Sequence, residues 1–558
     1  MAYESLEKLN ALWTRNFTLM KPDSRPPGPT PTRLGVTCLP HAEAMSAAAE
    51  PVTKLTLRIM LSSERLRAAL IAVLSGLLFA LAFPRAGFVW AAPLGAGALF
   101  WTWQRASWKR AFYLGWLCGT VFFTISFWWW STTIATAVGL LAYAAVIVSA
   151  AYQGLAIALA GVMTSLASRR VAPALAPLAA ALAFTITEWL RSIGEFGVPF
   201  AQLGVTQVET PLRALGAFVG TSGLTLVLFA LGAYAAYGVR TRTWRAFLAC
   251  AAVVAIAACA AWFAWPARVV PVPRIPVVAV QGNIAQSLKW QPGSLERAVT
   301  IYTAMTHAAI ARHPQLIVWP ETVIALYGEG LNGDRQLISQ FIALAEQANA
   351  TIVVGSIRLN NDRYYNSLYL FTPAGVSGVY DKRQLVPFAE HFPGKQFLFW
   401  LPYIGALNGN YAEGDGRGVL STTTGLPIGA LICWESAFGA LAYDEVRDGA
   451  QVLVISTDDA WFGTSSGPYQ HAQIAQMRAI ETGEYVVRAA ATGISGLIAP
   501  DGSWQARLPL DVQGNVSGNV GPAVGSPFAH IGPTRIWIAL IALYVLLLTL
   551  PSRRRQAQ

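Results

Sequence analysis

Charged residues are scarce in this chain. Asp, Glu, Lys and Arg together make up 12% of its 558 residues, whereas soluble globular proteins carry about 25%. Hydrophobic residues reach 54%, and the mean hydropathy is +0.44. This shortage of charge excludes an ordinary soluble protein and indicates an integral membrane protein.

Cysteine and histidine are also rare, with five and six residues respectively. Cys433 is the only cysteine between residues 271 and 535, so it has no disulfide partner within that polar stretch. An extracytoplasmic location of this stretch remains possible without a disulfide framework. Without a Cys-x-x-Cys motif or a histidine-rich cluster, we predict no structural zinc, no other metal and no cofactor. The other four cysteines lie in the N-terminal tail or in apolar segments (Cys38, Cys118, Cys250 and Cys259).

Long runs without charge predict membrane spans. A transmembrane helix needs about 20 apolar residues, and the longest uncharged segment has room for two such helices. The sequence thus predicts eight spans, which lie within residues 68–84, 86–104, 111–168, 171–187, 214–239, 246–267 and 536–552.

The basic residues predict the orientation of these spans, because lysine and arginine resist translocation whereas acidic residues matter little. With eight spans, the basic groups given at the end of this paragraph all fall on one side, which should be the cytoplasm. The polar stretch between spans seven and eight then faces outward. The groups are Arg65 and Arg67; Arg105, Lys109 and Arg110; Arg169 and Arg170; Arg240, Arg242 and Arg245; and Arg553, Arg554 and Arg555.

The formal charge of +11 does not indicate nucleic-acid binding. Residues 271–535 contain 16 Lys and Arg and 20 Asp and Glu, a net charge of −4, which leaves +15 (24 minus 9) for the rest of the chain. The basic excess therefore reflects topology. Residues 1–60 are polar and contain several prolines, so we expect a disordered cytoplasmic tail. A second hypothesis is that translation begins at Met45 or Met60.

The outward region, residues 271–535, alternates short β-branched runs with helical stretches, which is typical of one α/β domain with its own core. We expect residues 61–270 to form the first seven transmembrane helices, and residues 536–558 to form the eighth with a basic cytoplasmic tail. The expected strands are 275–280, 316–319, 351–356, 367–371, 428–433 and 452–456, and the expected helices are 295–312, 336–348 and 470–484.

Three polar residues follow strand-like runs. Glu321 follows Ile317-Val318-Trp319-Pro320, Lys382 follows Val379-Tyr380-Asp381, and Cys433 follows residues 428–432. Each alone has an ordinary explanation, because a free cysteine is usually a small buried hydrophobe and a lone charged residue is usually solvated. Together they describe an acyl-transfer site. Glu321 can accept the thiol proton, and Lys382 can stabilise the oxyanion that forms when the thiolate attacks an ester. His471 is more consistent with a helix start than with a general base.

Several motifs around these residues resemble the nitrilase superfamily. They are Trp319-Pro320-Glu321, Tyr380-Asp381-Lys382, Ile432-Cys433-Trp434-Glu435, Gln281-Gly282-Asn283-Ile284, Leu288-Lys289-Trp290, Leu385-Val386-Pro387-Phe388-Ala389-Glu390 and Asp459-Ala460-Trp461-Phe462-Gly463. With eight spans, the chain from about residue 61 is similar to the apolipoprotein N-acyltransferase family. The resemblance implies an α/β domain, a nitrilase-like αββα sandwich, inserted between helices seven and eight of an all-α membrane domain. The chain has Trp434 where some relatives have tyrosine, and Asp458 and Ala491 where asparagine is common.

The resemblance also implies a reaction. Such enzymes pass an acyl chain, typically the sn-1 chain of phosphatidylethanolamine, to the α-amine of diacylglyceryl-cysteine on an apolipoprotein. The chain would first be held as a thioester on Cys433, which gives ping-pong kinetics. Glu321 would be the general base and Lys382 the oxyanion stabiliser, and Glu390 and Glu435 would be supporting active-site acids.

Further expectations concern the surroundings of this reaction. Three aromatic residues, Trp290, Trp434 and Trp461, match positions near the site, where they could contact acyl chains. The resemblance implies a multi-pass protein of the bacterial inner membrane, with a periplasmic catalytic domain. We expect a monomer whose partners are the bilayer, the phospholipid donor and the lipoprotein acceptor.

Two alternatives remain open at this point. A membrane-tethered nitrilase-like amidase would use the same Glu321, Lys382 and Cys433, although a small soluble amide gives no reason for eight spans. A catalytically inactive scaffold that binds lipoproteins would not need the three residues at all.

Overall fold

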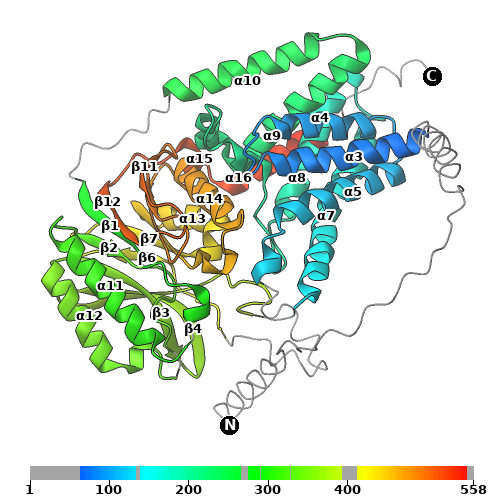
Figure 1. The fold of residues 1–558 in the computed structure, drawn as a ribbon. Helices are drawn as coiled ribbons and strands as arrows, with labels where there is room; N and C mark the ends of the chain where they lie inside the picture. Colours follow the sequence, from blue (N-terminus) through cyan, green and yellow to red (C-terminus); the bar gives the residue numbers. More distant parts are fainter. Residues whose placement is uncertain are drawn as a thin grey trace, which may run out of the picture. The chain divides into compact units, whose positions relative to one another are not determined.

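A computed structural model describes residues 63–133, 139–264, 274–289, 291–326, 328–391 and 411–549 (Figure 1). Apart from Ser63, these residues all belong to one compact unit, Glu64–Gln558. The expected N-terminal tail, the two alternative start positions and Trp290 lie outside the described residues.

Apolar helices form at all of the segments in which the sequence predicts spans. Among the described residues, four helical stretches are long and apolar enough to cross a membrane, namely Leu141–Ala167, Pro173–Leu190, Arg213–Thr241 and Arg245–Ala264, and Pro533–Thr549 is a shorter apolar helix. The helices are α3 (Glu64–Leu81), α4 (Ala91–Trp103), α5 (Trp108–Ser126), α7 (Leu141–Ala167), α8 (Ala176–Leu190), α9 (Arg213–Thr241), α10 (Arg245–Ala264) and α16 (Pro533–Thr549).

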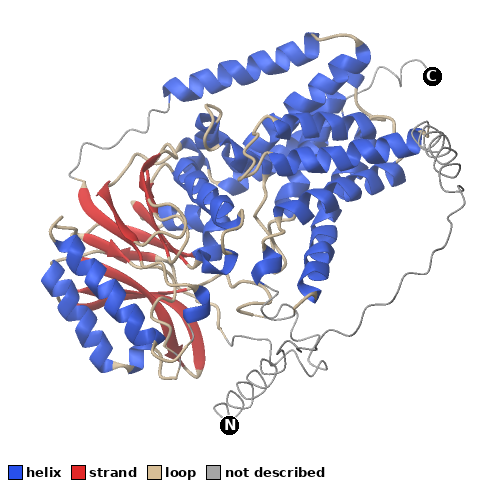
Figure 2. Ribbon diagram, viewed as in Figure 1, coloured by secondary structure: helices blue, strands red, loops and turns tan. Residues whose placement is uncertain are grey.

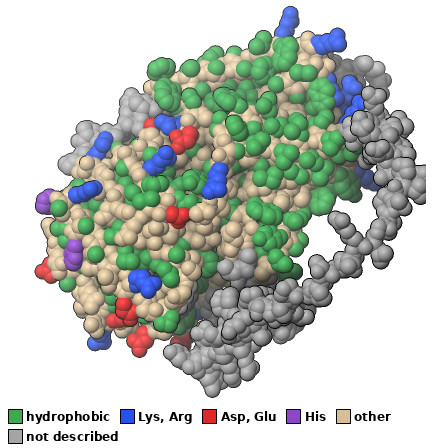
Figure 3. Space-filling model, viewed as in Figure 1, with side chains coloured by type: hydrophobic (Ala, Val, Ile, Leu, Met, Phe, Trp, Pro, Cys, Tyr) green, Lys and Arg blue, Asp and Glu red, His purple; other side chains and the backbone are tan. Residues whose placement is uncertain are grey.

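Glycines allow these apolar helices to approach one another closely. A Cβ atom on Gly119 of α5 would lie 2.6 Å from the Cα atom of Gly154 on α7, and one on Gly97 of α4 would lie 2.7 Å from the carbonyl oxygen of Gly232 on α9. Packing of backbone against backbone is typical of helices in lipid, where the hydrophobic effect does not drive helices together. Hydrophobic side chains cover most of the surface over these helices, with Lys and Arg at its far edge, whereas both acidic and basic side chains lie over the strands and their helices (Figure 3).

The polar region after α10 folds into two six-stranded sheets, with the orders β12-β1-β2-β3-β4-β5 and β11-β10-β9-β8-β7-β6. In the first sheet β1, β2 and β3 are parallel to one another, and in the second sheet β7, β8 and β9 are. All other neighbouring strands in the two sheets are antiparallel. The strands are β1 (Ile275–Gln281), β2 (Leu316–Val318), β3 (Thr351–Asn360), β4 (Arg363–Thr372), β5 (Gly375–Asp381), β6 (Val419–Ser421), β7 (Pro427–Ile432), β8 (Val452–Thr457), β9 (Tyr485–Ala490), β10 (Gly496–Ile498), β11 (Trp504–Arg507) and β12 (Gly514–Val520).

The two sheets face each other and carry helices on their outer faces (Figure 2). One apolar core, which includes Val318 and Ile432, lies between the sheets. A second core lies under α11 (Ser294–Ile310) and α12 (Arg335–Ala348), and a third lies under α13 (Gly439–Arg447) and α14 (Gly467–Thr482). This layering confirms the predicted αββα sandwich.

A strand or helix is present at each of the places where the sequence predicts one in this region. The pattern did not reveal β6, β9, β10, β11, β12, α13 or α15 (Pro527–Ile531), and of β5 it showed only the end before Lys382. Strand β12 is rich in glycine and polar residues, and the fully buried Arg488 interrupts the apolar run of β9. Both features hide the alternation on which strand prediction relies.

The close contact between α5 and α7 gives a first prediction. Because a Cβ atom at position 119 overlaps the backbone of Gly154, Gly119→Ala should destabilise the folded protein by about 1–3 kcal/mol. Thermal unfolding of the detergent-solubilised protein measures the loss. Gly416→Ala is the control, since nothing lies within 4 Å of its Cβ position. Equal melting temperatures for the two variants would contradict the proposed tight packing.

Candidate active site

The thiol of Cys433 lies at a strand end in a strained backbone conformation. The sequence predicts strand through residue 433, but β7 ends at Ile432, and Cys433 begins a short 3₁₀ turn, η5 (Cys433–Ala437). Its φ of +51° lies in the left-handed region, which non-glycine residues enter at an energetic cost. The expected strand 428–433 was therefore one residue too long, because the chain turns at Cys433.

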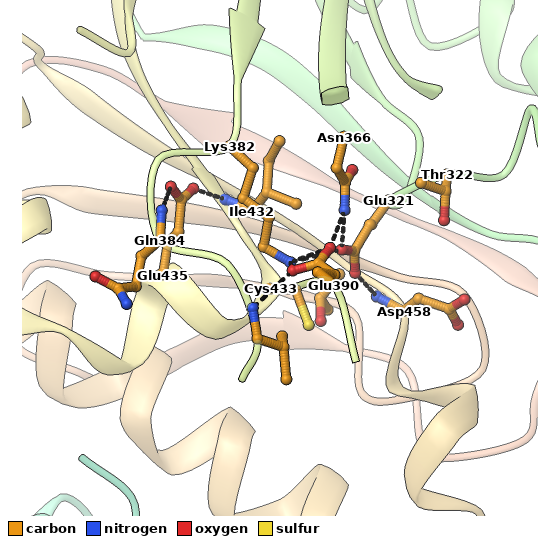
Figure 4. Close-up of polar contacts among 12 residues, drawn as sticks. Glu321, Thr322, Asn366, Lys382, Gln384, Glu390, Ile432, Cys433, Glu435 and Asp458 are labelled. Atoms are coloured by element: carbon orange, nitrogen blue, oxygen red, sulfur yellow. Dashed lines mark hydrogen bonds and ion pairs between the residues drawn. The ribbon is translucent and has the colours of Figure 1, made fainter. Parts of the chain in front are cut away.

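Lys382 lies between two carboxylates. It directly follows β5, and its ammonium is 3.1 Å from Glu321 Oε1 and 3.0 Å from Glu390 Oε1. Asn366, on the adjacent strand β4, donates hydrogen bonds to the same two oxygens, at 2.7 Å and 2.9 Å. Figure 4 shows these side chains converging with Cys433. The structure therefore brings the three residues predicted from strand ends into one site.

The groups of this site are buried, so their charges act strongly on one another. Lys382, Glu321 and Cys433 are 1%, 5% and 8% exposed. Burial opposes the charge on Glu321, but Lys382, Lys289 and the Asn366 hydrogen bond outweigh it and lower the pKa of that carboxyl. Burial likewise opposes the charge on Lys382, yet Glu321 and Glu390 raise the pKa of its ammonium.

The thiol behaves in the opposite way. Burial, reinforced by the negative charge of Glu321, raises the pKa of Cys433 well above its usual value, and Lys382 only partly offsets this. The resting site therefore holds a neutral thiol beside an ionised carboxylate and an ammonium. Proton transfer from Cys433 must accompany attack on a substrate, since a free thiolate is disfavoured here.

The second oxygen of Glu321 is fixed by the backbone of the opposite sheet. Asp458 N–H donates to Glu321 Oε2 at 2.8 Å, just beyond β8. The Asp458 carboxylate is in turn paired with Lys289 at 2.5 Å, and Lys289 also donates to Thr322 Oγ1 at 2.6 Å. Asp458 thus pairs with a lysine from the β1 side of the sandwich.

Glu435 connects η5, the turn that begins at Cys433, to the loop that follows Lys382. Its Oε2 accepts from Ile432 N–H at 2.7 Å, directly before Cys433. Its Oε1 accepts from Arg383 N–H at 2.6 Å, Gln384 N–H at 3.1 Å and the Tyr380 hydroxyl at 2.8 Å. The predicted supporting acid therefore holds two site loops in register, whereas Glu390 contacts Lys382 directly.

The predicted aromatic residues have different settings. Trp434 is buried and stacks on Phe200, from the segment between α8 and α9, with ring centroids 5.1 Å apart. Trp461 is 43% exposed, and its carbonyl oxygen accepts a hydrogen bond from Thr133 at 2.8 Å. Both residues thus lie where the sandwich contacts the segments of the apolar helices. Trp290 is outside the described residues.

The sequence placed His471 near a helix start but did not show that it belongs to a buried polar cluster beneath Cys433. His471 lies in the second turn of α14, and its Nε2 is 3.1 Å from the carbonyl oxygen of Cys433. Its Nδ1 lies 2.8 Å from Asp459 Oδ1, and Asp459 Oδ2 accepts from Arg488 at 2.6 Å. His471 thus contacts the backbone of Cys433. The sequence signal was the Asp-Asp pair after β8, but only the fold pairs it with residues on α14 and β9.

Asn366 was also missed. It is one polar residue inside a strand of tyrosines and leucines, Arg363–Thr372, and nothing in that local pattern marks it as a partner of Glu321. Among the described residues, no group of three or more His, Cys, Asp and Glu side chains could hold a metal ion.

Comparisons with known proteins match both parts of the chain. Residues 277–522 match the carbon-nitrogen hydrolase family, and residues 75–234 match the apolipoprotein N-acyltransferase N-terminal domain. Among solved structures, Nit3 of Saccharomyces cerevisiae, a member of the nitrilase superfamily, is 18% identical with a TM-score of 0.36, covering 50% of this chain and 97% of that one.

Curated relatives extend the match over nearly the whole chain. An apolipoprotein N-acyltransferase of Methylococcus capsulatus is 32% identical over 84% of this chain and 93% of its own length. A second, from Allorhizobium ampelinum, is 33% identical over 83% of this chain and 91% of its own length. The chain is therefore an acyltransferase that belongs to the apolipoprotein N-acyltransferase family.

Proposed function

We propose that this enzyme transfers an acyl chain, the sn-1 chain of a phospholipid such as phosphatidylethanolamine, to the α-amine of diacylglyceryl-cysteine at the N-terminus of an apolipoprotein. The observation that carries the proposal is the buried thiol of Cys433 beside the Glu321–Lys382–Glu390 cluster, in a sandwich packed against apolar helices. Both substrates are amphiphiles of one membrane, so an enzyme fixed at the lipid surface replaces a search in water with positioning.

The first half-reaction forms a thioester. Cys433 Sγ attacks the ester carbonyl carbon while the thiol proton passes to Glu321, whose lowered pKa keeps it ionised and ready to accept. The Lys382 ammonium stabilises the oxyanion of the tetrahedral intermediate. The carbon–oxygen bond to the glycerol then breaks, and the leaving lysophospholipid alkoxide takes the proton back from Glu321.

The second half-reaction consumes the thioester. The neutral amine of the acceptor attacks the same carbonyl carbon, and Glu321 receives a proton from the new ammonium. The carbon–sulfur bond then breaks, and the sulfur of Cys433 takes that proton from Glu321, which restores the thiol and the carboxylate. Because donor and acceptor react in turn with one thiol, the kinetics should be ping-pong.

The remaining predicted residues support these steps. Glu390 and Asn366 hold the Lys382 ammonium and the Glu321 carboxylate in place. Glu435 fixes the loop of the nucleophile against the loop of the lysine. Trp434 and Trp461 are proposed to contact the lipid chains, and Trp290 is proposed for the same role from the motif alone.

We further propose the membrane arrangement expected from the sequence. Residues 61–270 would hold seven spans and residues 536–558 the eighth, with the catalytic domain, residues 271–535, between them. The protein would lie in the inner membrane of a bacterium. The basic residues beside the spans support a cytoplasmic location for the span ends that carry them, so the catalytic domain would lie in the periplasm. The enzyme would act as a monomer without a cofactor.

Trapping the thioester tests the proposed chemistry. Incubation with phospholipid labelled in its sn-1 chain should place the label on the protein, and neutral hydroxylamine should remove it. Cys433→Ala should take up no label. Cys118→Ala, which removes a different buried thiol, in α5, should take up label as the wild type does. Adding a diacylated lipopeptide should move the label to its amine. Release of ammonia from small amides without any protein label would favour the amidase instead.

Replacing the base tests the role of Glu321. Glu321→Gln keeps the shape of the side chain but cannot accept the thiol proton, so thioester formation should slow about 100- to 10,000-fold. Single-turnover labelling with the same phospholipid measures this rate. Glu329→Gln, at an exposed position of the following loop, is the control. A Glu321→Gln rate close to that of the control would exclude Glu321 as the base.

The electrostatics of Glu321 predict a pH effect. Lys289 helps to lower the pKa of this carboxyl, so in Lys289→Met the carboxyl should protonate at a higher pH than in the wild type. A protonated Glu321 cannot act as base, so the acid limb of the pH profile for thioester formation should shift to higher pH. Lys109→Met, at an exposed helix position, should leave the limb unchanged. An unmoved limb in Lys289→Met would show that another group controls it.

A further inference from the structure

Helix α14 is buried on two opposite faces. One face, with Ala475 and Ala479, packs in the core under the β7–β8–β9 sheet. The other, with Ile474, Met477 and Ile480, belongs to the same apolar core as the membrane-domain helices. The helix is therefore shared between the catalytic sandwich and the apolar helices.

Polar contacts fix both ends of α14 to these helices. Near its start, the Gln470 amide donates to the carbonyl oxygen of Ser126, the last residue of α5, at 3.0 Å. Near its end, Glu481 Oε1 accepts from both the backbone N–H and the hydroxyl of Thr221 on α9, at 2.8 Å and 2.7 Å. Glu481 and Thr221 are both buried, so water does not replace these bonds.

The contact with Thr221 occurs at a break in α9. Gly220 has φ +64° and ψ −171°, which interrupts the helix, so a new helical segment begins at Thr221. A helix start leaves backbone N–H groups without partners and favours a negative charge, and the Glu481 carboxylate supplies both an acceptor and that charge. Glycine is required at the break, because a Cβ atom there would lie 2.4 Å from the ring of Phe528.

The same carboxylate is connected to the nucleophile turn. Glu481 Oε2 is paired with Arg478 at 2.9 Å, and Arg478 also donates to the carbonyl oxygen of Ala437 at 3.3 Å. Ala437 is the last residue of η5, the turn that begins at Cys433. One turn of α14 therefore contacts the break in α9 and the end of the catalytic turn.

We propose that Glu481 is a positioning residue that holds the Cys433 turn in register with the membrane helices, so that an ester held in the bilayer reaches the thiol. Glu481 touches neither Cys433 nor its charged partners in the site described above, so it acts through Arg478 and α14. This proposal rests on the proposed function, since it concerns lipid that arrives from the membrane.

The test compares two reactions of the same thiol. Iodoacetamide is small and soluble, so its alkylation of Cys433 needs no alignment with the bilayer. Thioester formation from labelled phospholipid, with the full-length enzyme in phospholipid vesicles, needs that alignment. In Glu481→Gln the rate of thioester formation should fall about 10- to 100-fold, which is the loss expected from a small misplacement of the reacting groups. The rate of alkylation by iodoacetamide should stay within about twofold of the wild-type rate.

Matched variants sharpen this comparison. Thr221→Val removes the hydroxyl that donates to Glu481 and accepts from Arg478 at 3.3 Å, and it keeps the backbone N–H contact with Glu481. It should therefore cause the same selective loss at smaller size. The double variant should lose less than the sum of the two single losses, because both changes disrupt one connected cluster of Glu481, Thr221 and Arg478. Glu484→Gln is the control, since this buried neighbour accepts from Ala523 N–H at 3.2 Å. It should leave both rates unchanged. Should Glu481→Gln fail to fold, Thr221→Val alone decides the question.

Each result separates the two proposals. Unchanged thioester formation in Glu481→Gln and Thr221→Val would overturn the positioning role while leaving the proposed function intact. An equal fall in alkylation and thioester formation would also overturn it, because the carboxylate would then merely support the folded site. If the wild-type enzyme itself acquired no label from phospholipid, the proposed function would fall and the positioning role with it.

Discussion

The active site depends on one buried ammonium held between two carboxylates. Lys382 contacts both Glu321 and Glu390, and together they leave one net negative charge to be stabilised by neutral donors. Asn366 and the backbone N–H groups of Val386 and Asp458 supply these donors. Buried charges are tolerated only when such partners are complete, and losing one leaves the others uncompensated. The positions of the three loops that follow β2, β5 and β8 are therefore set by the same requirement.

The electrostatic arrangement also explains how a buried thiol can be safe at rest and reactive with substrate. Burial, reinforced by the negative charge of Glu321, raises the pKa of Cys433 and so disfavours its thiolate. In the proposed mechanism the thiol proton passes to Glu321 during attack on the ester, and the negative charge then lies on the oxyanion, where Lys382 would stabilise it. A neutral thiol is also oxidised less readily than a thiolate.

Much of this arrangement could be predicted from local pattern. Six strands, three helices and the strand-end positions of Glu321, Lys382 and Cys433 follow from β-branched runs and the polar residues that end them. The rest could not be predicted in this way. Asn366 is an ordinary polar residue in its own strand, and its role exists only because β4 lies beside Glu321. The left-handed conformation of Cys433 likewise depends on the turn that Glu435 holds against the Lys382 loop.

The sequence by itself determined that the chain is rich in uncharged helical segments, that its polar region is an α/β domain, and that a base, a cation and a thiol follow separate strands. These properties depend on composition and spacing along the chain. Only the tertiary structure decided which charges are paired, that His471 contacts the backbone of Cys433, and that α14 joins the sandwich to a broken α9 through Glu481. Such contacts join residues far apart in sequence, and the free energy of a buried charge depends on what surrounds it in space.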